Sequence, residues 1–352
     1  MKSFDYLRPE TLEEALAALS DPDTAVLGGG TNLLDLMKLG VALPDRLVDL
    51  TRLPGLDRIE TLPDGSWRIG AMVRNADLAR DPGFAAAFPM VAEALLSGAS
   101  AQLRNAATLG GNLMQATRCA WFQDPQARCN RRAPGSGCDA LEGANRGHAV
   151  LGWTPACIAV HPSDFCVPLA ALDAQVEVAG PAGIRHVPLE TFHLLPGEEA
   201  HRVTALEPGE IVLALRLPAA AAAFAGHARY LKLRERTSFA FALLSAAAAL
   251  RVEDGRIAEA RLALGGVAAR PWRCHAAEVL LESAPAAPDS FARAAAAALE
   301  TAAPSGANGY KIVLAERILA RALAAAAAGT PAEMPALPGS LMDDSDRETA
   351  HA

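Results

Sequence analysis

The sequence lacks several features that identify common classes of protein. Its longest nearly uncharged apolar stretch, residues 237 to 250, has 14 residues, whereas a helix needs about 20 to span a bilayer. Basic residues are the minority, 32 against 40 acidic ones, so the chain has no net basic charge for nucleic acid. No continuous apolar segment follows Met1, and we expect no signal peptide in this chain. These absences disfavour membrane-spanning and nucleic-acid-binding functions.

Recognisable hydrolytic and zinc motifs are also missing. No Ser-His-Asp or Cys-His arrangement has the spacing of a nucleophile and its base. The cysteines form no Cys-x-x-Cys pair, which zinc sites usually contain. The histidines form no His-x-x-x-His pair, and His148, His161 and His193 are expected in loops as surface or hydrogen-bonding residues. A hydrolase is therefore not indicated.

The composition is that of a folded protein with more than one domain. Hydrophobic residues make up 51% of the 352 residues and charged residues 20%, which excludes a disordered chain. The first segment predicts a helix after the Thr11-x-x-Glu14 capping box, then a strand at 25–27. A second helix should begin at Thr31 or Asn32 and end near residue 40, before a strand at 47–50. This is a β-loop-α-β unit.

The rest of the chain predicts two further units. Hairpins are expected around residues 63–65 and over 176–188, with a strand at 210–218. The stretch 98–173 has no clear periodicity, and we expect a long functional loop there. A strand at 257–264 and three helices ending near residue 328 follow. The domains predicted are residues 1–57, 58–218 and 222–328, with a tail at 329–352.

The first candidate site is the glycine segment from Leu27 to Leu34. Three glycines between a strand and a helix let the backbone approach a phosphate closely, and the helix N-terminus favours its charge. The segment is not a P-loop, because no Lys-Ser or Lys-Thr pair follows, and it lacks the G-x-G-x-x-G spacing. An ordinary glycine-rich turn is the alternative.

The second candidate site is the segment from Arg104 to Leu113, which contains Thr108, Gly110, Gly111 and Asn112. Its hydroxyl, amide and backbone groups could bind a polar ligand. Alone, this segment is better explained as a turn. Together the two segments predict two backbone cradles that hold one long anionic cofactor between two subdomains.

Five of the six cysteines lie in the stretch predicted to be a loop, and Cys274 is remote. We favour an iron-sulfur cluster, because four thiolates can converge from wide loop spacings. Disulfides are the next alternative and structural zinc the last. Trp121 and Phe122 could shield a cluster from water, and nearby arginines could offset its negative charge. These arginines are Arg118, Arg128, Arg131, Arg132 and Arg146.

Four motifs resemble one known family in their order and spacing. They are Leu-Gly-Gly-Gly-Thr-Asn-Leu at 27–33, Leu-Arg-Asn-Ala-Ala-Thr-Leu-Gly-Gly-Asn-Leu at 103–113, Ser163-Asp164, and Leu-Gly-Gly-Val-Ala-Ala-Arg-Pro at 264–271. The chain resembles the FAD-binding medium subunit of the xanthine oxidase family of molybdenum hydroxylases over residues 1–328. The resemblance implies an α+β fold: a two-subdomain FAD-binding domain of the vanillyl-alcohol-oxidase type and a small α+β C-terminal domain.

The resemblance also implies which residues bind FAD. The cofactor would be cradled by the first glycine segment, with further contacts from the second segment and from three more distant positions. The residues carried over are Leu27, Gly28, Gly29, Gly30, Thr31, Asn32, Leu33, Leu34, Gly98, Thr108, Gly111, Asn112, Asp164, Val212 and Lys232.

The insertion at 118–157 is similar to the flavin subunits of bacterial periplasmic aldehyde oxidoreductases. Members of that branch hold a 4Fe-4S cluster here, as do 4-hydroxybenzoyl-CoA reductases. The ligands implied are Cys119, Cys129, Cys138 and Cys157, whereas Cys166 follows the Ser-Asp-Phe motif and would be structural. The cluster could be an electron relay or a structural clasp.

The function implied is electron transfer within a complex. A large molybdenum-cofactor subunit would oxidise an aldehyde, and a small subunit with two 2Fe-2S clusters would pass the electrons on. FAD in this chain would receive them and deliver them to an external acceptor. The chain would be periplasmic by co-export with a partner, or cytoplasmic. The alternatives are a stand-alone flavin oxidase of related fold, and a non-enzymatic iron-sulfur or disulfide-stapled binding protein.

Overall fold

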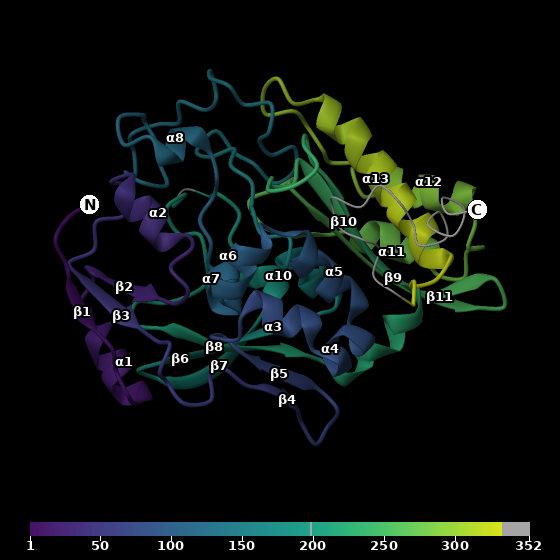
Figure 1. Cartoon of the computed structure of the whole chain (residues 1–352). Coiled ribbons are helices and arrows are strands. Elements are labelled where there is room, and N and C mark those ends of the chain that lie inside the picture. Colours follow the sequence, from purple (N-terminus) through teal and green to yellow (C-terminus); the bar gives the residue numbers. More distant parts are fainter. Residues whose placement is uncertain (198, 333–352) are drawn as a thin grey trace, which may run out of the picture.

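The computed structural model describes residues 1–197 and 199–332 and arranges them around three sheets (Figure 1). The first unit is a parallel sheet in the order β1-β3-β2. Its elements are β1 Asp5–Leu7, α1 Leu12–Ala18, β2 Thr24–Leu27, α2 Leu33–Lys38 and β3 Arg46–Asp49. The Thr11 side chain caps α1 by accepting a hydrogen bond from the Glu14 N–H at 3.2 Å. The predicted β-loop-α-β unit is confirmed.

The second unit is an antiparallel five-stranded sheet in the order β4-β5-β8-β6-β7. Both predicted hairpins belong to it. Its strands are β4 Ile59–Thr61, β5 Trp67–Gly70, β6 Gln175–Gly180, β7 Gly183–Pro188 and β8 Ile211–Leu217. Its helices are α3 Asn75–Arg80, α4 Pro82–Ala87, α5 Pro89–Ser97, α6 Ala101–Ala106, α7 Leu109–Leu113, α8 Ala120–Gln123, α9 Cys166–Ala171 and α10 Leu189–Phe192.

The third unit is an antiparallel sheet in the order β12-β11-β10-β9 with helices packed on it. The 3-10 helix η1 Ala219–His227 leads into it. Its elements are β9 Ala228–Leu233, β10 Leu244–Glu253, β11 Arg256–Gly265, β12 Trp272–Arg273, α11 His275–Leu281, α12 Pro288–Ala297 and α13 Tyr310–Ala327. The three predicted C-terminal helices are confirmed.

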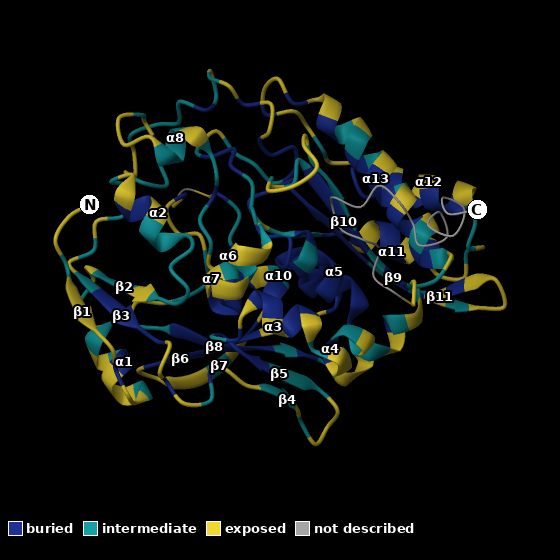
Figure 2. Ribbon diagram, in the orientation of Figure 1, coloured by how far each residue is buried: buried dark blue, intermediate teal, exposed yellow. Residues whose placement is uncertain are grey.

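Both faces of the four-stranded sheet are covered, which explains the alanine run of β10. Ala247 and Ala249 belong to the core that also contains α5, α9 and the five-stranded sheet. Ala246 and Ala248 face the other way, into the core under α11, α12 and α13. A strand buried on both faces reads as a continuous apolar run rather than an alternation. Helix α5, buried on nearly every side (Figure 2), therefore lies between the two sheets.

The stretch predicted as one long loop, residues 98–173, contains the short helices α6, α7, α8 and α9. The Ser100 and Thr108 side chains cap α6 and α7 by accepting hydrogen bonds from Leu103 and Gly111 N–H groups. These helices have four to six residues, too few to give a periodic pattern. No helix in the described part of the chain is long and apolar enough to cross a membrane. Most of the predicted tail, residues 333–352, lies outside the described residues.

Candidate cofactor sites

The two glycine segments pack directly against each other. A Cβ on Gly28 would lie 2.7 Å from Thr108 Oγ1, and a Cβ on Gly29 would overlap the carbonyl oxygen of Ala106. Gly30 has a φ of +72°, in the left-handed region that favours glycine. Gly29 is therefore needed because the backbone of the second segment packs against it. We expected a phosphate to make this close approach instead. The two predicted cradles form one wall.

This wall borders a cavity of about 750 Å³, a volume typical of ligand sites. The cavity lies where the three structural units meet, since α2, the segment around α6 and α7, and the loop after β9 all line it. Seven of the predicted FAD residues line it: Thr31, Asn32, Gly98, Gly111, Asn112, Asp164 and Lys232.

The other predicted residues do not line the cavity. Gly28, Gly29 and Thr108 lie where the two segments pack together, whereas Gly30 packs against Leu27 and Leu34 of its own segment. Val212 is in the buried core of the second unit, on β8 opposite Val178. The structure therefore does not bring Val212 to the cavity, because its side chain packs among core residues. Three more predicted FAD residues do not line the cavity: Leu27, Leu33 and Leu34.

A buried charged group closes one side of the cavity. The Lys232 ammonium donates hydrogen bonds to Asp164 Oδ2 at 2.7 Å and to the Ser97 carbonyl at 3.1 Å. Tyr230, two residues earlier on β9, donates its hydroxyl to Asp164 Oδ1 at 2.6 Å. Burial and the Asp164 charge raise the pKa of Tyr230 well above its usual value. The sequence pattern did not identify Tyr230, because nothing in it shows which residues of β9 face Asp164.

Two asparagines on the cavity wall have unsatisfied polar atoms. Asn32 accepts a hydrogen bond from the Ala116 N–H at 2.9 Å, but its buried Nδ2 has no partner among the described residues. Buried Asn75 Oδ1 likewise has none there. Buried polar groups are normally hydrogen-bonded, so one spare donor and one spare acceptor fit a polar ligand. Asn32 begins α2 as predicted, although its side chain bonds Ala116 instead of capping the helix.

Arginine and phenylalanine side chains that the sequence analysis did not identify as cavity residues form the opposite wall. Arg118 donates hydrogen bonds to the Ala116 carbonyl and Gln115 Oε1, and its guanidinium lies 4.7 Å from the Phe241 ring centroid. Burial lowers the pKa of Arg118. It forms no ion pair with a carboxylate of residues 1–197 or 199–332, although the charge of Asp35, another lining residue, acts on it.

The four cysteines predicted as cluster ligands converge on a second, much smaller cavity. Cys119, Cys129, Cys138 and Cys157 line it together with aromatic residues of α8, and all four are free thiols. Cys129 and Cys138 also pair as an isolated β-bridge. Burial raises the pKa of Cys119 to about 11 and raises that of Cys138. Cys166 and Cys274 lie in the two main cores instead.

The spacing of these sulfurs argues against zinc, and none of them is paired in a disulfide. Tetrahedral zinc with Zn–S bonds of about 2.3 Å brings sulfurs to roughly 3.8 Å from one another. No three of the four sulfurs in the described structure all lie within 4.8 Å of one another. Arg131 donates from Nε to the Cys157 sulfur at 3.2 Å, and His148 Nε2 lies 3.2 Å from the Cys119 sulfur. Burial lowers the pKa of His148, which favours the neutral ring.

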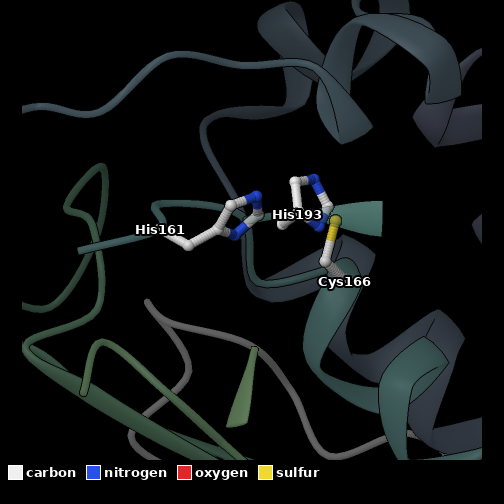
Figure 3. Close-up of side chains that lie close together, drawn as sticks. All are labelled: His161, Cys166 and His193. Carbon is white, nitrogen blue, oxygen red and sulfur yellow. The ribbon is translucent and has the colours of Figure 1, made fainter. Parts of the chain in front are cut away.

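His161, Cys166 and His193 form another compact group, with potential ligand atoms within 4.8 Å of one another (Figure 3). His193 Nε2 lies 2.9 Å from the Leu113 carbonyl and must donate to it, which leaves Nδ1 as an acceptor. His161 Nδ1 accepts from the Ser163 N–H, which leaves a proton on Nε2. A protonated nitrogen cannot ligate a metal, and burial raises the pKa of the Cys166 thiol to about 12. The two rings pack against each other with their centroids 4.2 Å apart, and burial lowers the pKa of both, which favours their neutral forms.

Comparison with known proteins identifies the architecture. Residues 2–220 match the family model described as the FAD binding domain in molybdopterin dehydrogenase. The chain belongs to this family. Residues 229–326 match the CO dehydrogenase flavoprotein C-terminal domain. The resemblance to FAD-binding medium subunits of the xanthine oxidase family is thus confirmed, as is the α+β fold with a separate C-terminal domain.

Individual members of the molybdopterin dehydrogenase family resemble the chain over nearly its whole length. The aldehyde oxidoreductase FAD-binding subunit PaoB of Escherichia coli is 47% identical and covers 93% of this chain and 99% of its own. The carbon monoxide dehydrogenase medium chain of Hydrogenophaga pseudoflava is 30% identical, covering 92% and 96%.

Solved structures of the family superpose on this one. Carbon monoxide dehydrogenase from Hydrogenophaga pseudoflava gives a TM-score of 0.72 at 29% identity, covering 93% of this chain and 98% of that one. Quinoline 2-oxidoreductase from Pseudomonas putida 86 gives 0.71 at 27% identity, covering 93% and 97%. As a member of this family, the chain is the FAD-binding subunit of an oxidoreductase of the molybdenum hydroxylase type.

Proposed function

We propose that this chain receives electrons on FAD within a molybdenum-dependent aldehyde oxidoreductase complex. The relative at 47% identity is named an aldehyde oxidoreductase FAD-binding subunit, and the match extends over 99% of that protein. The observation that carries the proposal is the cavity of about 750 Å³. Both glycine segments pack against each other and form one of its walls. Its spare donor on Asn32 and spare acceptor on Asn75 suit a polar cofactor.

The chain's own residues would bind and orient the flavin. The predicted glycine segments would form the wall against which it lies, while Asn32, Asn112 and Thr31 would supply polar contacts. Arg118 would offset the charge of an anionic group, because no carboxylate of the described residues pairs with it. Bound FAD would supply the redox chemistry, and the protein would supply binding, orientation and electrostatics.

The buried acid-base groups that line the cavity are not free to act on an aldehyde. Asp164 and Lys232 pair with each other, and the Tyr230 hydroxyl donates a hydrogen bond to Asp164. A general base must be able to reach and accept a substrate proton, and none of these three has that freedom. We therefore infer that electrons come from partners: a large molybdenum-cofactor subunit and a small subunit with two 2Fe-2S clusters.

We further propose that Cys119, Cys129, Cys138 and Cys157 hold one 4Fe-4S cluster. The four thiols surround one cavity, are not paired as disulfides, and are too widely spaced for zinc. Arg131 directs its guanidinium at a sulfur, which suits the negative charge of a thiolate-ligated cluster. Cluster ligation would supply one-electron redox chemistry or tie the insertion together.

Anaerobic visible spectroscopy on the isolated chain and on the assembled complex tests the electron-transfer function. We expect flavin and iron-sulfur absorption in the isolated chain, with no bleaching of the flavin when an aldehyde is added. With both partner subunits present, the same aldehyde should bleach it. Rapid bleaching in the isolated chain would instead establish a stand-alone flavin oxidase, and absence of flavin would establish a non-enzymatic binding protein.

A further inference from the structure

Two side chains direct polar nitrogens at sulfurs of the four-cysteine site. Arg131 Nε donates to the Cys157 sulfur at 3.2 Å, and His148 Nε2 lies 3.2 Å from the Cys119 sulfur. The Ala159 N–H also donates to Cys157, at 3.5 Å. A neutral thiol is a weak acceptor, so a guanidinium aimed at one has little purpose unless the sulfur carries charge.

Arg131 has no other evident task. Within the described ranges it forms no ion pair with a carboxylate, and its only side-chain hydrogen bond goes to the Cys157 sulfur. The neighbouring arginines differ in this respect. Arg128 pairs with Asp139 at 2.6 Å, and Arg132 donates to backbone carbonyls of the same insertion. Arg131 therefore presents an unneutralised cation to the cysteine site.

His148 is held toward Cys119 by the C-terminal domain. Its carbonyl accepts hydrogen bonds from the Lys311 ammonium at 2.8 Å and from Asn308 Nδ2 at 3.0 Å. Its own N–H donates to the Asn145 carbonyl at 3.0 Å. With both backbone groups fixed, the ring has little freedom to turn away from the sulfur. The buried Nδ1 has no hydrogen-bond partner in the part of the chain that the structure describes, and Nε2 lies within hydrogen-bond distance of the Cys119 sulfur.

The Cys119 contact also lies beside the flavin cavity. Arg118, which precedes Cys119, lines that cavity, and so does Gly147, which precedes His148. The hydrogen-bonded edge of the cysteine site therefore faces the cavity. Cys138, which is partly exposed, receives no side-chain donor among the described residues.

We infer that Arg131 and His148 set the reduction potential of the cluster by donating hydrogen bonds to two of its four thiolate ligands. This inference rests on the proposed 4Fe-4S cluster. Reduction adds one negative charge, and donors to the sulfurs stabilise the more negative state. The two side chains therefore raise the potential, and both are positioning residues rather than ligands.

The test is an EPR-monitored titration of the full chain with dithionite, with iron and FAD measured in each sample. Arg131→Gln and His148→Leu should keep their iron and FAD while the cluster's midpoint moves to a more negative potential. The His148→Gln amide can donate from nearly the same place as Nε2, so the midpoint of this variant should lie close to that of the wild type. Arg251→Gln is the matched control, since Arg251 is exposed, pairs with Glu253 and Glu259 and does not contact a sulfur. Its midpoint should equal that of the wild type.

The possible outcomes separate the two proposals. Wild-type protein without iron would refute the cluster itself. Iron-loaded Arg131→Gln and His148→Leu with unchanged midpoints would overturn the inference and leave the cluster standing. If Arg131→Gln fails to fold, Arg131→Lys keeps the charge but loses the Nε donor. A midpoint for Arg131→Lys equal to the wild type would likewise overturn the role assigned to the hydrogen bond.

Discussion

The Lys311 ammonium donates a hydrogen bond to the carbonyl of His148 at 2.8 Å, which ties the C-terminal domain to the cysteine insertion. It also donates to the carbonyls of Gly147 at 2.9 Å and Gly266 at 2.6 Å. The Lys311 side chain is buried, and burial lowers its pKa to about 7. One lysine therefore joins α13, the insertion and the four-stranded sheet without a carboxylate partner in the described structure.

Lys311 should make stability rise with pH above neutrality. Its pKa is about 7 when folded and 10.5 in the unfolded chain, so the unfolded state binds more protons between these values. Stability is then lowest below pH 7 and increases toward pH 10.5, with a slope of at most about 1.4 kcal/mol per pH unit. Thermal midpoints of the wild type and Lys311→Met, measured across this range, should diverge in favour of the wild type as pH rises. A constant difference would contradict the assignment.

Gly29→Val should lose most of the bound FAD. The new side chain would overlap the Ala106 carbonyl and push the two glycine segments apart, which would open the cavity wall. FAD released by denaturation and measured per chain gives the result. Gly226→Ala is the control, because nothing lies within 4 Å of the Cβ it would add and its φ is not in the left-handed region. One FAD per chain in Gly29→Val would refute the site.

The local motifs were predictable because each depends on a few adjacent residues. The Thr11 cap, the β-loop-α-β unit and the hairpins follow from short-range periodicity and turn chemistry. The position of β8 was also evident from its apolar run. Which of its residues faces a cofactor was not, because a strand buried on both faces shows no alternation. Val212 came from the family resemblance rather than from a pattern, and its side chain packs in the core.

Sequence patterns could not predict the contacts between segments that are distant along the chain. Tyr230 meets Asp164, and Arg118 meets Phe241, across more than 60 residues each, and no period links such positions. His148 was expected only as a loop histidine with a hydrogen-bonding role. Its place opposite Cys119 depends on Asn308 and Lys311, which lie in another domain.

Lys232→Met should destabilise the fold and weaken flavin binding. The Lys232 and Asp164 side chains are 3% and 8% exposed, and removing one partner of a buried pair costs about 3 to 5 kcal/mol. Chemical denaturation and FAD content should both report the loss. Arg251→Met removes an exposed partner of Glu253 and Glu259, so it should change stability by less than about 1 kcal/mol. Equal effects of the two substitutions would show that the buried pair contributes no more to stability and FAD binding than the exposed one.

Cys138→Ala should abolish the iron content of the chain while leaving FAD in place. Cys138 is one of the two partly exposed thiols of the four and belongs to neither main core, so its replacement disturbs the cores little, yet a 4Fe-4S cluster needs all four ligands. Iron and acid-labile sulfide in anaerobically purified protein provide the measurement. Cys166→Ala and Cys274→Ala serve as controls, because those thiols lie in the main cores away from the insertion. They should lose stability but retain iron. Loss of iron in Cys166→Ala together with its retention in Cys138→Ala would show that the ligand set is wrong.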